Sequence, residues 1–176
     1  MKRLLMLCAL ITISLAAPAD HDQVFGKATE GIRNLRVIDS KVACAGSITP
    51  ENVSGIKDMG FASIINLRRE EEQGARLEEE ASAARAAGIN YIHIPFNGRD
   101  PQTAAVDTFL AALADPANAP AFIHCAGGSR AASMWYTKRV LQDGLDKEHA
   151  LAEAKELGLG SEALEAFMND YIDSHR

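Results

Sequence analysis

The chain has 176 residues, of which 47% are hydrophobic, and its 18 Lys and Arg against 24 Asp and Glu give a formal net charge of −6. This length is ample for one hydrophobic core and short for two ordinary domains. The acidic balance argues against general binding to nucleic acids or anionic membranes, because both kinds of binding require basic patches.

The first nineteen residues have the pattern of a secretory signal peptide. A positive start at residues 2–3 and an apolar stretch over residues 4–15 precede small residues at 17–19. The apolar stretch is shorter than the roughly twenty residues of a membrane-spanning helix. We therefore predict a signal peptide over residues 1–19, export to the bacterial periplasm without membrane attachment after cleavage, and a single mature domain over residues 20–176.

The mature chain alternates strand-like and helix-like segments. Strands are predicted at Val37–Ala45, Ser63–Leu67, Tyr91–Ile94 and Ala121–His124, each followed by a helical segment. This order predicts an α/β fold with a mostly parallel central sheet that is flanked by helices. In such a sheet, ligands bind beyond the carboxyl ends of the strands, which directs attention to the loops that follow them.

Local signals also predict where the helices begin and end. The pairs Thr49-Pro50 and Asp100-Pro101 have the cap-then-proline pattern of helix starts, and the acidic run at residues 70–72 is expected to open a further helix. Glycines at positions 60, 88, 144 and 158 fall where helices should end. Two amphipathic helices are expected from Asp146 onward.

The last predicted strand leads into a loop suited to nucleophilic attack on an anion. Cys125 follows the strand, and a helix predicted over residues 129–142 would stabilise its reactive thiolate through the positive helix N-terminus. Glycines at 127 and 128 allow backbone N–H groups to point at an oxyanion, while Arg130 offers a bidentate guanidinium. The groups predicted to bind the anion are the Arg130 side chain and the backbone of Ala126, Gly127, Gly128 and Ser129.

The loop resembles the signature of cysteine-dependent protein phosphatases, in which His-Cys is followed by five residues and an arginine. Here only four residues separate Cys125 from Arg130. Four is also the spacing in rhodanese sulfurtransferases, which would carry a persulfide on Cys125. The loop alone leaves open a phosphatase, a sulfurtransferase, or a non-catalytic module that binds phosphate.

Segments upstream of the loop resemble a bacterial family that is similar to dual-specificity and tyrosine phosphatases, the phosphatase-like domain of beta-lactamase-hydrolase-like proteins. The matching segments are residues 45–51, 60–72, 88–95 and 124–130. The resemblance implies a cysteine-dependent phosphatase fold and the hydrolysis of phosphate monoesters through a phosphocysteine intermediate, without a cofactor. The implied substrate is a phosphorylated protein or a small phosphate ester.

The resemblance also places a general acid on the loop after the third predicted strand. Asp100 is the carboxylate of that loop, and its alternative role is the N-cap of the helix expected to begin at Pro101. His124 is predicted to support the loop, because strand alternation points it away from Cys125. Arg68 is predicted either to anchor its own loop through Glu72 or to add a second cation to the anion site.

The remaining candidates are the other cysteine and the histidines. Cys44 lies in an apolar run and is interpreted as a buried strand residue, with the alternative of a redox partner for Cys125. The spacing of the His, Cys, Asp and Glu residues predicts no metal site.

Overall fold

A computed structural model describes residues 24–26, 29–38 and 41–176. The predicted signal peptide, residues 1–19, lies outside the described residues. Among the described residues no helix has the length and apolar character needed to cross a membrane.

The described strands form one sheet in the order β1-β2-β3-β6-β4-β5. Their bounds are Val24–Gly26 (β1), Arg36–Ile38 (β2), Val42–Ala45 (β3), Ser63–Asn66 (β4), Asn90–His93 (β5) and Ala121–His124 (β6). Strands β3, β6, β4 and β5 run parallel, whereas β1 and β2 extend the sheet in antiparallel fashion. The predicted α/β class with a mostly parallel sheet is therefore confirmed.

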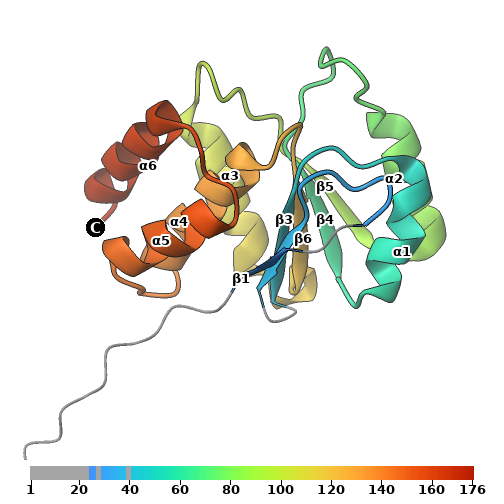
Figure 1. The fold of residues 1–176 in the computed structure, drawn as a ribbon, viewed down its shortest axis with the longest axis horizontal. Coiled ribbons are helices and arrows are strands. Elements are labelled where there is room, and N and C mark those ends of the chain that lie inside the picture. Colours follow the sequence, from blue (N-terminus) through green and yellow to red (C-terminus); the bar gives the residue numbers. More distant parts are fainter. Residues whose placement is uncertain (1–23, 27–28, 39–40) are drawn as a thin grey trace, which may run out of the picture.

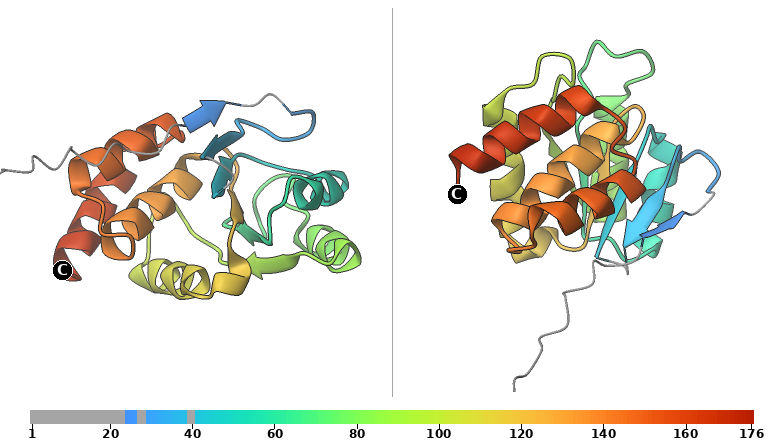
Figure 2. Two further views of the ribbon diagram at one scale, coloured as in Figure 1. Left: turned by 90° about the horizontal axis from the view of Figure 1, so that it is seen from below. Right: turned by 60° about the vertical axis from the view of Figure 1, so that its left-hand side comes forward.

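Helices cover both faces of the sheet. The α-helices span Val53–Asp58 (α1), Leu77–Ala87 (α2), Thr103–Ala114 (α3), Ser129–Leu141 (α4), Lys147–Glu156 (α5) and Glu162–Ser174 (α6), with short 3-10 turns at Pro50–Asn52 (η1) and Pro116–Asn118 (η2). Figures 1 and 2 show α1 and α2 on one side of the sheet and α3 to α6 on the other. The fold thus has three layers.

The central strands supply both cores because each is buried on its two faces. On β6, Phe122 packs with the residues of α1 and α2, while Ile123 packs with those of α3 to α6. On β4, Ile64 likewise belongs to the core on the side of α1 and α2, and Ile65 to the core on the side of α3 to α6. Successive side chains of a strand point to opposite faces, so an uninterrupted apolar run is what a strand between two helical layers needs.

Most predicted helix boundaries agree with the structure. Helix α4 begins at Ser129, two helices follow Asp146, and the 3-10 turn η1 begins at Pro50. The glycines that were expected to end helices all adopt positive φ, as Gly88 does at the end of α2 with φ 66°. A left-handed residue of this kind ends a helix at low cost only when it has no Cβ.

Two predicted segments were wrong at their boundaries. The strand expected over Val37–Ala45 is two antiparallel strands, β2 and β3, and the Lys41 backbone N–H donates to the Ile38 carbonyl at 2.7 Å between them. The acidic residues 70–72 do not open a helix, because α2 begins only at Leu77. The loop before α2 instead contacts the side chains of Arg68 and Arg130.

Candidate active site

Cys125 lies at the carboxyl end of β6, at the start of the loop that leads into α4. Its side chain is almost fully buried, and its Sγ accepts a hydrogen bond from the Gly128 backbone N–H at 3.1 Å. An N–H donor at a helix N-terminus stabilises negative charge on the sulfur. The structure therefore brings together the predicted nucleophile and one of the predicted backbone donors, the Gly128 N–H.

The carbonyl groups of this loop are turned outward by a neighbouring segment. The Ala126 carbonyl accepts from the Ser47 backbone N–H at 3.2 Å, and the Gly127 carbonyl accepts from Asn34 Nδ2 at 3.0 Å. Because N–H and C=O point in opposite directions in a trans peptide, these contacts turn the N–H groups of Gly127 and Gly128 toward the other side of the loop. The second of these N–H groups is the one that reaches Sγ.

Sequence reasoning missed the role of Asn34 in this arrangement. Asn34 is the described non-glycine residue with a positive φ, 51°, a conformation that asparagine tolerates better than most residues. An asparagine in this conformation is a local signal for a turn, but its partner Gly127 is 93 residues away in the sequence. The backbone is also closely packed at Gly46, where a Cβ would lie 3.0 Å from the Ala126 carbonyl oxygen.

Arg130 donates four hydrogen bonds to acceptors on two loops. Its Nη1 donates to the carbonyls of Leu67 and Phe96 at 3.0 and 2.7 Å and to Glu72 Oε1 at 2.7 Å. Its Nη2 donates to Glu72 Oε2 at 2.8 Å, which completes a bidentate ion pair. The arginine predicted to bind the anion is thus fastened to the loops after β4 and β5.

The Glu72 carboxylate is the partner that sequence reasoning did not assign to Arg130. Burial raises the pKa of Glu72, but hydrogen bonds from Arg130 and from the Arg69 backbone outweigh burial and lower that pKa to about 2. Burial likewise lowers the pKa of Arg130, while Glu72 and Cys125 raise it above its ordinary value. Both members of the pair are therefore charged throughout the neutral range.

Arg68 makes the contacts expected of a residue that anchors its own loop, which was one of the two roles predicted for it. Its side chain is buried and donates to the carbonyls of Gln73 and Gly74 at 2.6 and 2.8 Å, and its Nε lies 3.6 Å from Glu72 Oε2. These contacts explain why residues 70–76 form a loop, because the carbonyls that a helix would use internally are turned toward Arg68. Arg68 does not line the cavity described below.

His124 lies on the opposite face of β6 from Cys125, in contact with α2. It is fully buried, and its Nε2 lies 3.4 Å from Glu80 Oε2. The same oxygen accepts from Asn66 Nδ2 at 2.7 Å and from the Tyr91 hydroxyl at 3.2 Å. Burial and then Glu80 raise the pKa of Tyr91. This polar cluster lies beneath the loop, and sequence reasoning missed Glu80 because it reads as one of several exposed acidic residues in α2.

A cavity of about 320 Å³ opens beside Arg130. The residues that line it come from the loops after β4 and β5 and from α4: Arg69, Glu72, Asn97, Gly98, Arg99 and Arg130. Gly98 approaches Arg130 closely, since a Cβ on Gly98 would lie 3.3 Å from Arg130 Cγ. Two of the three arginines in this cavity, Arg69 and Arg99, were not among the predicted site residues.

Asp100 follows directly after this cavity lining but is not part of it. Its carboxylate is exposed and accepts a hydrogen bond from Gln102 Nε2 at 3.3 Å. The alternative prediction that Asp100 caps a helix beginning at Pro101 was wrong, because α3 begins at Thr103 with Gln102 at the N-cap position. Asp100 is therefore not committed to a helix cap.

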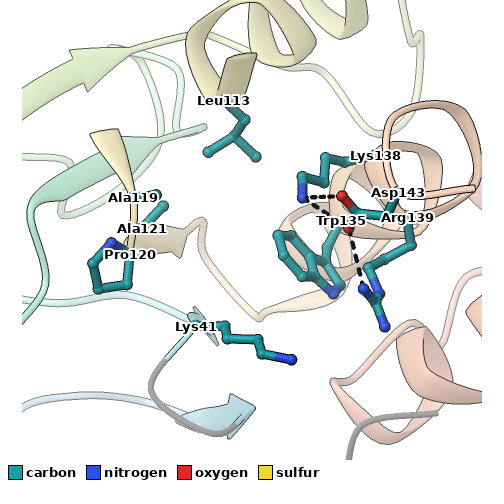
Figure 3. Close-up of a pocket in the computed structure, with 9 residues that line it drawn as sticks. All are labelled: Lys41, Leu113, Ala119, Pro120, Ala121, Trp135, Lys138, Arg139 and Asp143. Carbon is teal, nitrogen blue, oxygen red and sulfur yellow. Dashed lines mark hydrogen bonds and ion pairs between the residues drawn. The ribbon is translucent and has the colours of Figure 1, made fainter. Parts of the chain in front are cut away.

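A second cavity, of about 530 Å³, lies at the opposite end of the sheet, near the first residues of β3 and β6 (Figure 3). Lys138 and Arg139 line it, and both point toward Asp143, at 2.6 and 3.1 Å. Arg139 also pairs with the buried Glu153, to which Trp135 Nε1 donates. The positive charges of α4 in this cavity are thus neutralised by carboxylates of the protein itself.

The other candidate ligands do not form a cluster. Cys44 is fully buried, and burial followed by the charge of Cys125 raises its pKa well above the ordinary value. Both described cysteines are free thiols. Within residues 24–26, 29–38 and 41–176 there is no group of three His, Cys, Asp or Glu side chains that could hold a metal ion.

Solved structures with this architecture define the class of the fold. A DUF442 protein from Shewanella putrefaciens superposes with a TM-score of 0.69 at 21% identity, covering 84% of this chain and 94% of that one. P. aeruginosa TpbA, in complex with pTyr, gives 0.65 at 18% identity, with 86% and 93% covered. The core catalytic domain of the PP-IP phosphatase SIW14 from S. cerevisiae gives 0.63 at 19% identity, with 84% and 88% covered. The chain has the α/β fold of the cysteine-based phosphatases.

Sequence comparison identifies the family within this class. Residues 34–142 match the family described as beta-lactamase hydrolase-like protein, phosphatase-like domain. A beta-lactamase hydrolase-like protein of Agrobacterium fabrum is 32% identical over 123 residues, and one of Xylella fastidiosa is 28% identical over 132 residues. These matches cover 69% and 72% of this chain but only 27% and 30% of the relatives. The chain belongs to this family of phosphatase-like domains, as predicted.

The backbone at Gly128 gives a first testable prediction. Gly128 has φ 107°, so Gly128→Ala should lower the free energy of unfolding by about 1–3 kcal/mol through backbone strain. Gly127 has no such φ, and a Cβ there would meet no atom within 4 Å. Gly127→Ala is the matched control and should change stability by less than about 0.5 kcal/mol. Urea denaturation of both variants measures the difference, and equal stabilities would contradict it.

The Glu72–Arg130 pair predicts a pH dependence of stability. The pKa of Glu72 is about 2 in the folded chain against an ordinary value of 4.5, so its stabilisation is complete above about pH 4.5 and is lost as the pH falls toward 2. In Glu72→Gln, the fall in the free energy of unfolding between about pH 6 and about pH 3 should be smaller by about 2 kcal/mol. Urea denaturation at about pH 6 and about pH 3 measures it. If the free energy of unfolding fell as much in the variant as in the wild type, Glu72 would not be the source of the pH dependence.

Proposed function

We propose that this domain is a cysteine-dependent phosphatase of the tyrosine or dual-specificity type, which hydrolyses phosphate monoesters through a phosphocysteine intermediate. The observation that carries the proposal is the contact of Cys125 Sγ with the Gly128 N–H at the N-terminus of α4. Membership of a phosphatase-like family supports it. Two of the three structural relatives, one bound to pTyr and one a PP-IP phosphatase, support a phosphate ester as the substrate.

The first step in this mechanism is attack by the Cys125 thiolate on the phosphorus atom. The S–P bond forms while the ester P–O bond breaks, and the leaving oxygen takes a proton from a general acid. The loop N–H groups of Gly127 and Gly128 and the Arg130 guanidinium stabilise the charge on the equatorial oxygens. The guanidinium is already oriented by Glu72, so no reorientation is needed when the phosphate binds.

The second step is hydrolysis of the phosphocysteine. Water attacks the phosphorus atom, the S–P bond breaks, and the thiolate is restored as inorganic phosphate forms. The proton released by the water goes to the carboxylate that acted as acid in the first step. We assign this role to Asp100, because its carboxylate is exposed and lies on the loop whose Phe96 carbonyl contacts Arg130. No step in this scheme requires a metal ion or cofactor.

The nucleophile is tested by hydrolysis of p-nitrophenyl phosphate by the reduced protein in the presence of a chelator. Cys125→Ser should lower kcat by at least about 10³-fold, and Arg130→Lys by about 10²-fold, because lysine cannot form the bidentate contact. Cys44→Ser is the control cysteine variant and should retain turnover. Equal rates for Cys125→Ser and the wild type would reject the mechanism. Cyanide-dependent sulfur transfer from thiosulfate would then favour the sulfurtransferase alternative suggested by the four-residue spacing.

The general acid is tested by the dependence on the leaving group. Asp100→Asn should lower kcat for phenyl phosphate by about 10²-fold, because phenolate leaves poorly without a proton. The same variant should lose less than about tenfold on p-nitrophenyl phosphate, whose leaving group needs little protonation. Asp58→Asn, on the exposed surface of α1, serves as the control. A uniform effect on both substrates would exclude Asp100 as the acid.

A further inference from the structure

The cavity beside Arg130 is lined by positive side chains other than Arg130 itself. Three of its six lining residues are arginines and one is a carboxylate. The surrounding chain is acidic, with a formal net charge of −6, so an anion approaching this cavity is attracted by local charges and repelled by the average surface. An arginine of this cavity can bind a ligand only with donors that the protein's own carboxylates leave available.

The ion pairs of the cavity distinguish the three arginines. Arg130 is paired in bidentate fashion with Glu72, at 2.7 and 2.8 Å. Arg69 lies 2.7 Å from Glu71 and 3.6 Å from Glu72. Arg99 forms no ion pair with any residue in the described part of the chain, and its side chain is exposed. The uncompensated positive charge of the cavity is therefore that of Arg99, with Arg69 partly neutralised beside it.

The loop that carries Arg99 is fastened to the anion-binding arginine. The Phe96 carbonyl accepts from Arg130 Nη1, and Asn97 Oδ1 accepts from the Arg99 backbone N–H at 3.1 Å. Gly98 lies between them and packs against the Arg130 side chain. These contacts hold the backbone of Arg99 next to the predicted phosphate site, so that a guanidinium three residues from the Phe96 carbonyl can reach a ligand held by Arg130.

The lining of the cavity is better suited to charge than to an aromatic ring. None of its six described lining residues is aromatic, so none offers a face on which a phosphotyrosine ring could stack. The volume of about 320 Å³ is at the lower end of the range for small-molecule pockets, yet it exceeds what a single phosphate needs. Arg69 and Arg99 are among the residues that line this space.

We infer that this cavity is a second anion subsite and that the substrates of the domain are small phosphate esters with another phosphate next to the reacting one. This inference rests on the proposed function for the identity of the reacting group. Arg99 binds the second phosphate, and Arg69 adds to its attraction. Only the ester bond at the reacting phosphorus breaks, so the second phosphate leaves unchanged on the product. Arg99 is a specificity-determining residue in this scheme.

The experiment measures binding directly, so that it does not depend on turnover. Isothermal titration calorimetry of the reduced, full-length protein with a chelator present gives the Kd of inorganic phosphate and of inorganic pyrophosphate. The wild type should bind pyrophosphate at least about tenfold more tightly than phosphate, and Arg99→Ala should reduce this ratio by about tenfold. Arg99→Lys should restore part of the ratio, because it keeps the charge but loses the bidentate geometry.

Arg85→Ala is the matched control, since Arg85 is exposed in the last turn of α2, at the far end of that helix from the loop after β4. It removes the same charge from the protein and should leave the ratio unchanged. An unaltered ratio in Arg99→Ala, or an equal fall in Arg85→Ala, would overturn the inference. Failure of the proposed function is distinguished by p-nitrophenyl phosphate hydrolysis, which would be absent or independent of Cys125 whatever the binding ratio.

Discussion

The ion pair between Arg130 and Glu72 is the contact on which the candidate site depends. It joins α4 to the loop after β4, and the same guanidinium also binds the carbonyls of Leu67 and Phe96. A partly buried charge is stable only when its donors are matched by acceptors, and here four hydrogen bonds satisfy two nitrogen atoms. The loops after β4 and β5 therefore cannot move independently of the nucleophile loop, and the cavity beside Arg130 exists because of this constraint.

The same ion pair has a cost for anion binding. A carboxylate in bidentate contact neutralises much of the attraction that Arg130 could offer to a phosphate, although it holds the guanidinium in one orientation. In a chain with a net charge of −6, the remaining attraction comes from the loop N–H groups, the N-terminus of α4 and the arginines at the rim of the cavity. In the proposed anion site, orientation and charge are thus supplied by different residues.

The two faces of β6 separate the proposed nucleophile from the buried polar cluster around Glu80. Cys125 belongs to the core formed with α3 to α6, whereas His124 lies on the other face, beside Glu80 of α2. Asn66 and Tyr91 complete the buried polar cluster around Glu80. A buried cluster of this kind is costly to rearrange, because each polar atom that loses its partner pays the full desolvation penalty. It therefore resists displacement of the strand from which the loop emerges.

The amino-acid sequence by itself determined the features that depend on near neighbours. The apolar runs of β4 and β6, the helix that begins at Ser129 and the glycine signals at helix ends follow from periodicity and backbone preference. With them follow the α/β class and the position of the loop between β6 and α4. The resemblance of its motifs to a known family then identified the family of the chain. The helix expected at residues 70–72 did not form where Arg68 binds the carbonyls of Gln73 and Gly74 and where Glu72 pairs with Arg130, 58 residues away.

Only the tertiary structure decided which side chains meet. Glu72 and Arg130 are 58 residues apart, and Asn34 and Gly127 are 93 apart, so no local pattern pairs them. Glu72 and Arg130 meet because parallel strands place their carboxyl ends at one edge of the sheet. Asn34 lies at the same edge because it precedes β2, which runs antiparallel to β3. The sequence can identify each charged residue, but its partner depends on strand order, and strand order depends on how the two apolar faces of the sheet are covered.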